Sequence, residues 1–209
     1  MTQSKCAICR RQGIKLFLKG DKCLSPACPF IKRPYPPGIR GKRRKPALSE
    51  YGKELKEKQK LKNWYNLREK QLGNYVREVL SKRSQAGDAA QVLIQKLERR
   101  LDNVVFRLGF AKSRNQARQL VSHGHFLVNQ KPVNIPSYQV KKGDKIRLKQ
   151  SSVQKKIFAG LEAVLKKHSP PSWLKLDAGK FSGEVIGLPT LEETAPPAEL
   201  SSIFEYYSR

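Results

Sequence analysis

The sequence predicts an α+β protein in which a mainly helical, discontinuous first domain receives an inserted module of two short helices on a small antiparallel sheet. Three observations predict this fold. Apolar residues recur at helical spacing over residues 48–83 and again near the C-terminus. Between residues 91 and 150 the apolar period changes from helical to strand-like. The first 47 residues contain all four cysteines, a basic proline-rich stretch and few large apolar side chains.

The four cysteines, Cys6, Cys9, Cys23 and Cys28, form two pairs with short spacers. Paired thiolates of this kind are typical of a tetrahedral structural zinc site, and around 30 residues with few large apolar groups need such a site in order to fold. The alternatives are two disulfides, unligated thiols, or an iron–sulfur cluster held by the same thiolates. Because the chain shows no export signal, disulfides are disfavoured, and we expect one zinc ion.

A basic arm follows over residues 34–46, where PYPPGIRGKRRKP combines rigid prolines with four consecutive cations from Lys42 to Lys45. This composition predicts an extended, solvated segment that a protein core does not absorb. A flexible basic tail has the same composition, so the residues of the arm leave its role open. We assign the zinc segment and the arm together to residues 1–47.

Ser49 is a candidate N-cap for a helix with acidic residues toward its start and lysines toward its end, the order that the helix dipole favours. Two or three short helices are expected before residue 84. Beyond the module, Ser152 can cap an amphipathic helix, and strands or extended segments are expected at 173–176 and 181–188.

A short C-terminal helix carries Leu200, Ile203, Phe204 and Tyr207 on one face. A helix this short is unstable alone, so we expect it to pack on the helices before residue 84. Residues 48–90 and 151–209 are therefore predicted to form one discontinuous domain around the module.

The module occupies residues 91–150. An apolar stripe at helical spacing runs from Leu93 to Leu108, and Gly109 is expected to end that helix. Ser113 begins a second helix with a capping-box pattern, and Gly124 ends it. Strands are then expected at residues 126–128 and 145–148, with a turn over residues 129–132.

The formal net charge of the chain is +26, and the module alone has 13 Lys and Arg residues against 3 acidic ones. Arg114 and Arg118 lie four residues apart, hence on one face of the second helix, with Lys112 and Arg107 nearby. A solvated face normally mixes charges of both signs. This face is therefore predicted to bind a polyanion, with nucleic acid the first candidate and an anionic membrane the second.

No apolar run approaches the roughly 20 residues that span a bilayer, so we expect a soluble, intracellular protein. The residues also lack a glycine-rich phosphate loop, a G-x-S-x-G sequence and an H-E-x-x-H sequence, and they include only three histidines. We therefore do not expect an enzyme.

The stretch RLDNVVFRLGFAKSRNQARQLVSHGHFLVN, followed by VNIPSYQVKKGDKI, resembles the RNA-binding module of the bacterial small-subunit ribosomal protein four family. The resemblance covers nearly the whole chain in order, from cysteine segment through arm, helical region and module to tail, and the four cysteines resemble the zinc-bearing form of that family. The same module occurs in some pseudouridine synthases, tyrosyl-tRNA synthetases and small heat-shock RNA-binding proteins. One departure is Gln130, where the family usually has glycine in the turn.

The resemblance implies a structural ribosomal protein that binds small-subunit ribosomal RNA at the five-way helical junction of the 5′ domain, nucleates small-subunit assembly and contributes to decoding accuracy in translation. It further implies ribosomal protein five as a neighbour, and contact of the arm with messenger RNA where it enters the subunit. The ribosome would be that of the cytoplasm or of an organelle. The alternative is an RNA-modifying enzyme or a stress RNA-binding protein that shares the module. A zinc-bearing DNA-binding regulator is disfavoured, because no recognition helix lies between the cysteine pairs.

In the mechanism we expect, lysines and arginines bind backbone phosphates, and the shape of the RNA junction supplies specificity. The predicted RNA-binding residues are basic residues of the arm together with basic and polar residues of the module. They are Arg40, Lys42, Arg43, Arg44, Lys45, Arg99, Arg107, Lys112, Ser113, Arg114, Asn115, Arg118, Gln119, His123 and Lys131.

Overall fold

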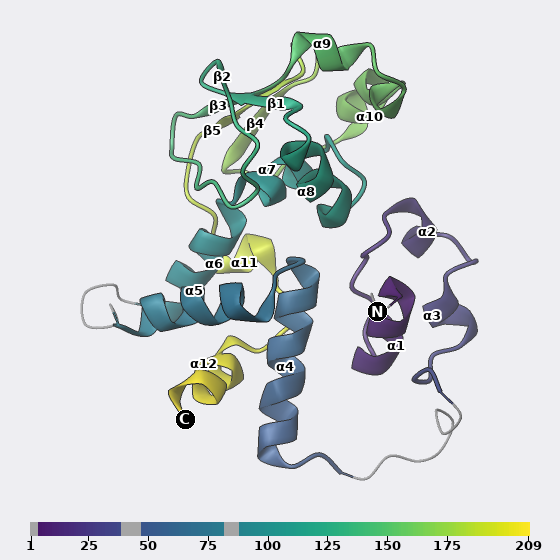
Figure 1. The fold of residues 1–209 in the computed structure, drawn as a ribbon, viewed down its shortest axis with the longest axis vertical. Coiled ribbons are helices and arrows are strands. Elements are labelled where there is room, and N and C mark those ends of the chain that lie inside the picture. The colour runs from purple at the N-terminus through teal and green to yellow at the C-terminus, as the bar shows by residue number, and fades with distance from the viewer. Residues whose placement is uncertain (1–3, 39–46, 82–87) are drawn as a thin grey trace. The chain divides into compact units, whose positions relative to one another are not determined.

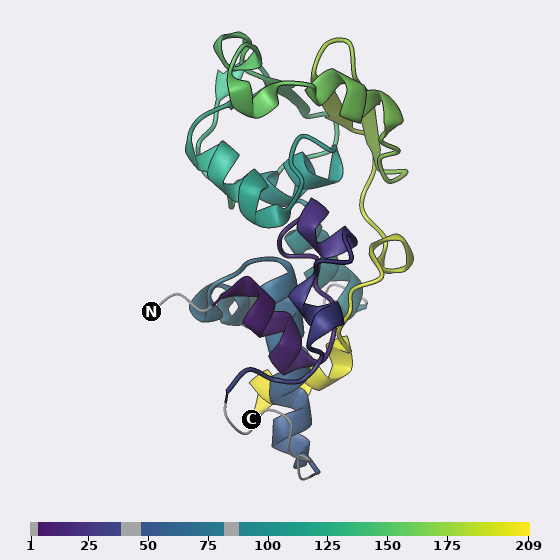
Figure 2. The same cartoon turned by 90° about the vertical axis from the view of Figure 1, so that its right-hand side faces the viewer.

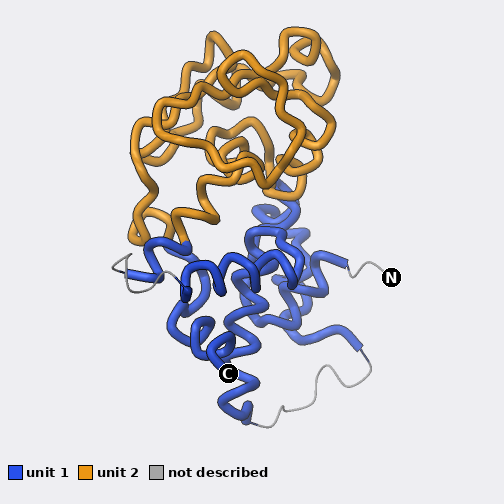
Figure 3. Tube along the Cα trace, turned by 60° about the vertical axis from the view of Figure 1, so that its left-hand side comes forward, with its two compact units in different colours: residues 1–93, 195–209 blue, residues 94–194 orange. Residues whose placement is uncertain are grey.

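The computed structural model describes residues 4–38, 47–81 and 88–209. The chain divides into two compact units, residues 1–93 with 195–209, and residues 94–194 (Figure 3). This division differs from the domain boundaries expected from the sequence. Residues 151–194, which we assigned to the helical first domain, belong to the second unit, and only residues 195–209 return to the first.

The first unit is built from helices. These are α1 (Lys5–Gln12), α2 (Asp21–Leu24), α3 (Pro29–Lys32), α4 (Glu50–Trp64), α5 (Glu69–Ser81), the beginning of α6 (Ala89–Glu98) and α12 (Leu200–Ser208). The predicted cap is present, since the Ser49 hydroxyl accepts a hydrogen bond from the Gly52 N–H at 3.3 Å. Asn66 takes a left-handed conformation with φ 55° just after α4, where the chain turns toward α5.

The C-terminal helix α12 packs on α4 and α5 (Figures 1 and 2), as its apolar face led us to expect. Leu200 and Ile203 are buried in this contact. A polar cluster adds to it: the Lys58 ammonium lies 4.1 Å from the centre of the Tyr206 ring, and the Tyr207 hydroxyl donates to Glu69 at 3.2 Å. Burial and the nearby Glu69 carboxylate raise the pKa of Tyr207 well above its usual range, so its hydroxyl keeps the proton that it donates.

The second unit combines helices with one sheet. It contains the end of α6, then α7 (Leu101–Arg107), α8 (Arg114–Ser122), β1 (Phe126–Val128), β2 (Lys131–Pro132), β3 (Lys145–Leu148), α9 (Gln150–Val153), the 3₁₀ helix η1 (Lys156–Phe158), α10 (Leu161–Lys167), β4 (Leu174–Asp177), β5 (Ser182–Val185) and α11 (Leu191–Thr194). The five strands form one antiparallel sheet in the order β2-β1-β3-β5-β4. The α+β class predicted from the sequence is thereby confirmed.

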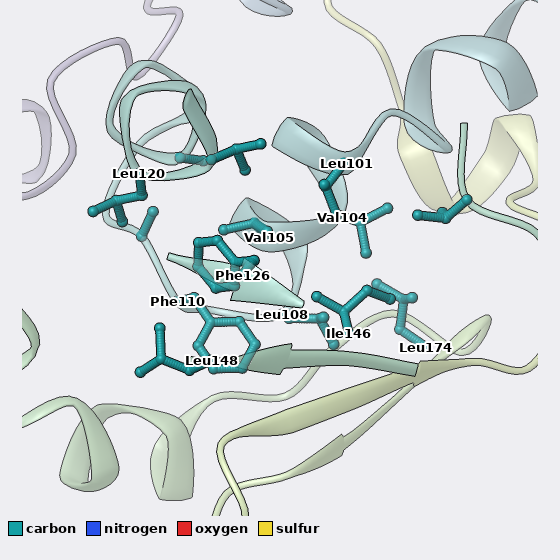
Figure 4. Packing of buried hydrophobic residues seen from close by; sticks show 14 of the residues in the cluster. Leu101, Val104, Val105, Leu108, Phe110, Leu120, Phe126, Ile146, Leu148 and Leu174 are labelled. Carbon is teal, nitrogen blue, oxygen red and sulfur yellow. The ribbon is translucent and has the colours of Figure 1, made fainter. Parts of the chain in front are cut away.

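Alternation along the strands separates a core face of the sheet from an outer face. In β3, Ile146 and Leu148 are buried while Lys145 and Arg147 are exposed. Figure 4 shows Ile146 of β3 and Phe126 of β1 facing apolar side chains of α7 and α8. The two helices and the core face of the sheet therefore share one apolar interior.

The first module helix differs from its prediction. The stripe that we assigned to one helix up to Leu108 belongs to two, α6 and α7, which are separated at Arg99 and Arg100. Arg100 is extended, with φ −66° and ψ 136°, and the loop around residue 138 pairs with this break. The Leu101 N–H donates to the Tyr138 carbonyl at 2.9 Å, and the Val140 N–H donates to the Arg99 carbonyl at 2.9 Å. These distant partners replace the helical hydrogen bonds that are lost.

Of the other local predictions, the helix cap and helix ends are confirmed, and the helix after Ser152 is not. The Ser113 hydroxyl accepts from the Gln116 N–H at 3.3 Å, and Gly109 and Gly124 have φ values of 84° and 70°, as expected for helix ends. The single amphipathic helix predicted after Ser152 is instead three short ones, α9, η1 and α10. Gly160, with φ 73°, stands before the last of them, and its left-handed backbone interrupts a continuous helix.

The β1–β2 turn carries two consecutive left-handed residues, Asn129 with φ 48° and Gln130 with φ 67°. A two-residue hairpin of this kind favours glycine at the second position. The Asn129 side chain supports the turn, since its Nδ2 donates to Asp144 at 2.8 Å and its Oδ1 accepts from the Lys145 N–H at 2.9 Å. Within the residues that the structure describes, no side-chain hydrogen bond supports Gln130, which bears the strain of the left-handed conformation.

We therefore expect Gln130→Gly to raise the free energy of unfolding by up to about 1 kcal/mol, because removal of the left-handed penalty outweighs the added freedom of the unfolded chain. Urea denaturation measures the change. Asn129→Gly is the matched control, and it should lower stability because it removes two side-chain hydrogen bonds. A Gln130→Gly variant less stable than the parent would contradict this account of the turn.

Candidate nucleic-acid interface

The outer side of α8 carries a group of exposed polar residues. Ala117, Leu120 and Val121 face the core, which leaves the other side of the helix toward solvent. We define the α8 face as Lys112, Asn115, Arg118, Gln119 and His123, which are exposed or half-buried. Lys112 precedes the helix, and its backbone N–H donates to the Gln116 side chain at 2.9 Å. The cap thus fixes the position of Lys112 relative to the helix.

Two further predicted arginines are held by a buried carboxylate. Glu98, at the end of α6, is 0% exposed, and its two oxygens each accept a 2.9 Å hydrogen bond from Arg107. The Asn103 amide donates to the same carboxylate at 2.6 Å. A bidentate pair of this geometry orients the guanidinium plane. Arg107 is consequently fixed at the surface, with 21% of its side chain exposed.

Arg114 joins the same network from the first turn of α8. Its Nε donates to the Asn103 side-chain oxygen at 2.8 Å, and its guanidinium lies 3.9 Å from Glu98 and 4.7 Å from the centre of the Phe106 ring. Only 10% of the Arg114 side chain is exposed. Glu98, Asn103, Arg107 and Arg114 form what we call the arginine network. One carboxylate balances two guanidinium groups, so the network keeps a net positive charge.

A second buried ion pair lies at the start of α7. Arg100 binds Asp102 through two hydrogen bonds, at 3.1 and 2.7 Å, and both side chains are almost fully buried. Burial raises the pKa of Asp102, while the charges of Arg100 and Arg118 oppose that change. The Arg99 side chain also binds the protein itself, since its Nε donates to the Val140 carbonyl at 2.8 Å. These contacts tie the α6–α7 break to the loop before β3.

The structure therefore separates the predicted binding residues into groups. Lys112, Asn115, Arg118, Gln119 and His123 share the α8 face, and Lys131 is exposed on β2. Arg107 and Arg114 belong to the arginine network, Arg99 binds the loop, and Ser113 is a buried cap. The arm residues Arg40, Lys42, Arg43, Arg44 and Lys45 lie outside the described residues.

Sequence reasoning missed Glu98 and Asn103, which hold the arginines in place. The sequence shows Glu98 as one of three acidic residues in a basic module, and this alone only weakly indicates that it binds arginines. Its burial depends on α7 folding back against the end of α6, and this follows from the break at Arg99–Arg100 that the apolar stripe did not indicate.

The two neighbouring histidines differ in their surroundings. His123 is exposed on the α8 face. His125 is buried, with its Nδ1 2.9 Å from the Ser152 hydroxyl oxygen and its ring against Phe158. Burial, reinforced by Lys155, lowers the pKa of His125 below its usual value. His125 is therefore a neutral structural residue, and only His123 can face a ligand.

The zinc prediction is wrong. Within residues 4–38, 47–81 and 88–209, no group of three or more His, Cys, Asp or Glu side chains is placed to hold a metal ion, and the four cysteines are free thiols. The same finding overturns the iron–sulfur alternative. Our reasoning assumed that this segment lacks a core, but Cys9, Leu16 and Leu18 are buried together, with Phe30 and Trp64 packed against them. Burial raises the pKa of Cys9, which keeps it a thiol.

Across the described parts of the chain, no helix combines the length and the apolar character needed to cross a bilayer.

The fold and the cationic α8 face define a protein that carries an S4 domain. The family model described as "S4 domain" matches residues 99–146, which include the α8 face and three members of the arginine network, Asn103, Arg107 and Arg114. The model described as "Ribosomal protein S4/S9 N-terminal domain" matches residues 1–98.

Individual relatives extend this match over the whole chain. The "Small ribosomal subunit protein uS4" of Caldicellulosiruptor saccharolyticus is 51% identical over 98% of this chain and 96% of its own length. The protein of the same name from Syntrophomonas wolfei is 48% identical over 100% and 98%. "Small ribosomal subunit protein uS4A" of Bdellovibrio bacteriovorus is 48% identical over 100% and 99%. The chain belongs to the uS4 family.

Proposed function

We propose that this chain is a structural, non-enzymatic protein of the small ribosomal subunit that binds ribosomal RNA through the α8 face and the adjoining arginine network. The observation that carries the proposal is the cationic surface on the packed helices α7 and α8, in a chain whose relatives are named for the small subunit. Lysines and arginines on such a surface bind phosphates and release counterions. The protein acts in translation as part of the ribosome.

The arginine network supports recognition by shape. Arg107 and Arg114 are fixed by Glu98 and Asn103, so their charges keep one spacing relative to the side chains of α8. A fixed pattern of cations selects an RNA whose phosphates match it, as at a folded junction, and discriminates little between base sequences.

The finer parts of the proposal rest on resemblance to the family. They are binding at the five-way junction of the 5′ domain, a place early in subunit assembly, a border with ribosomal protein five and an influence on decoding accuracy. The four consecutive cations Lys42–Lys45 suit the arm for contact with RNA, including messenger RNA where it enters the subunit. An RNA-modifying enzyme or a stress protein is not favoured, because relatives of nearly equal length match from end to end.

We expect Lys112→Ala combined with Arg118→Ala to weaken binding to small-subunit ribosomal RNA. The slope of log affinity against log salt concentration should flatten by about two, one for each lost phosphate contact. Filter binding of the 209-residue chain at several salt concentrations measures both quantities. Lys166→Ala with Lys167→Ala on α10 removes the same charge from the same unit and should leave the slope near its original value. Equal slopes for the two double variants would refute the assignment of the α8 face.

A further inference from the structure

The outer face of the sheet, opposite the face that packs on α7 and α8 (Figure 4), carries a second set of cations. In β3, Lys145 and Arg147 point outward, since their neighbours Ile146 and Leu148 are buried. Lys175 of β4 is exposed as well, and it lies opposite Glu184 of β5, which in turn lies opposite Lys145. Lys180 is exposed in the β4–β5 hairpin. We call Lys145, Arg147, Lys175 and Lys180 the sheet cations.

The sheet cations lie close together. Residues two apart on a strand are roughly 7 Å apart, and β3 and β4 are separated by two strand spacings, or about 10 Å. With Leu127, Asn129, Gln130, Asp177, Ser182, Gly183 and Glu184, the sheet cations line a groove of about 540 Å³. Four cations and two carboxylates give this groove a net charge of +2.

Three sheet cations differ from the arginines around α7 in having little intramolecular pairing. In the part of the chain that the structure describes, no side chain forms a hydrogen bond or an ion pair with the charged groups of Lys145, Arg147 or Lys175, although Glu184 lies between the two lysines in the register. Lys180 has a long contact with Asp177 at 3.9 Å, and both side chains are well exposed. Arg107 and Arg114, by contrast, are bound to Glu98.

The residues that line the groove also indicate the chemical class of ligand that it binds. Its neutral residues, Asn129, Gln130 and Ser182, carry hydrogen-bonding groups, and Leu127 is the one large apolar side chain in the lining. A protein partner docks through an apolar centre, which this groove lacks. A phosphate backbone needs cations and neutral hydrogen-bond donors, which the groove supplies.

We propose that the outer face of the sheet is a second RNA-binding surface, which takes a stretch of phosphodiester backbone from the same ribosomal RNA. This inference rests on the proposed function. The α8 face and the sheet cations would contact different parts of the RNA backbone, so that the second unit is bound by the RNA through two surfaces.

The test compares Arg147→Ala with Lys175→Ala, made together in the 209-residue chain, against the control pair Lys166→Ala with Lys167→Ala. The probe is small-subunit ribosomal RNA. We expect the slope of log affinity against log salt concentration to flatten by about two in the sheet pair and to stay near its original value in the control pair. Hydroxyl-radical footprinting should show lost protection at backbone positions other than those lost by Lys112→Ala with Arg118→Ala.

The outcomes separate this inference from the proposed function. If the α8-face pair weakens binding while the sheet pair leaves affinity, slope and footprint unchanged, the second surface is refuted and the proposed function stands. If neither pair changes binding, both are refuted. If the sheet pair binds RNA normally but fails to enter small subunits, the groove binds an acidic protein and the RNA assignment is overturned. Should the alanine pair lower the melting temperature, Arg147→Gln with Lys175→Gln keeps the aliphatic stems and takes its place, judged by the same outcomes.

Discussion

Replacing Glu98 by alanine is expected to lower the free energy of unfolding of the second unit by about 3–5 kcal/mol, the range observed when one partner of a buried ion pair is removed. Glu98 is fully buried and accepts two hydrogen bonds from Arg107 and one from Asn103. The variant loses the acceptor that these groups share, and water does not fully replace it. Urea denaturation monitored by fluorescence of Trp173, which is buried in this unit, measures the change in a Trp64→Phe background.

Glu162→Ala is the matched control for the Glu98 variant. Glu162 pairs with Lys166 one turn along α10 at 2.6 Å, and both side chains are more than half exposed. An exposed pair of this kind contributes between about 0 and 1 kcal/mol, so the control should have nearly the original stability. If the Glu98 and Glu162 variants lose equal stability, the arginine network does not stabilise the unit.

Deleting residues 198–209 is expected to destabilise the first unit by several kcal/mol. The deletion exposes the surfaces of α4 and α5 on which Leu200 and Ile203 are buried, and each buried side chain of this size contributes roughly 1.5–3 kcal/mol. It also removes the Arg209 guanidinium from the buried Glu54, a contact of 2.7 Å. Thermal unfolding monitored by Trp64 fluorescence in a Trp173→Phe background measures the loss.

Glu205→Ala serves as the control for this deletion, because Glu205 is exposed on α12 and its loss should leave the melting temperature nearly unchanged. RNA binding by the truncated chain, measured below its melting temperature, should be close to normal, since the α8 face belongs to the other unit. A deletion that keeps the melting temperature but abolishes RNA binding would make this tail a binding element instead.

The features that local sequence determines were predicted well. Ser49 and Ser113 cap helices, and Gly109 and Gly124 end them, because each of these needs only a few neighbouring residues. The strand at residues 145–148 was predicted as well, and in the structure its alternation turns Lys145 and Arg147 outward. The sheet cations could therefore have been identified from the sequence, had the pairing of β3 with β5 been known.

Features that depend on distant contacts were not predictable from residue patterns. The break between α6 and α7 is stabilised by carbonyl and amide groups near residue 138, about 40 residues away. Trp64, far along the chain, packs against the core of the cysteine segment, so a segment that was predicted to need zinc is packed with apolar side chains instead. The position of Arg114 on α8 suggested a solvent-facing cation, whereas Asn103, Phe106 and Glu98 nearly bury it.

The most direct test of the account is sedimentation of the chain from lysates of its own cell through a sucrose gradient, with the chain detected by antibody. We expect it to sediment with the small ribosomal subunit at low salt, and the variant Lys112→Ala with Arg118→Ala to leave the subunit at a lower salt concentration than the parent. A chain found only at the top of the gradient, while other small-subunit proteins sediment normally, would contradict the claim that it is a structural protein of the small ribosomal subunit.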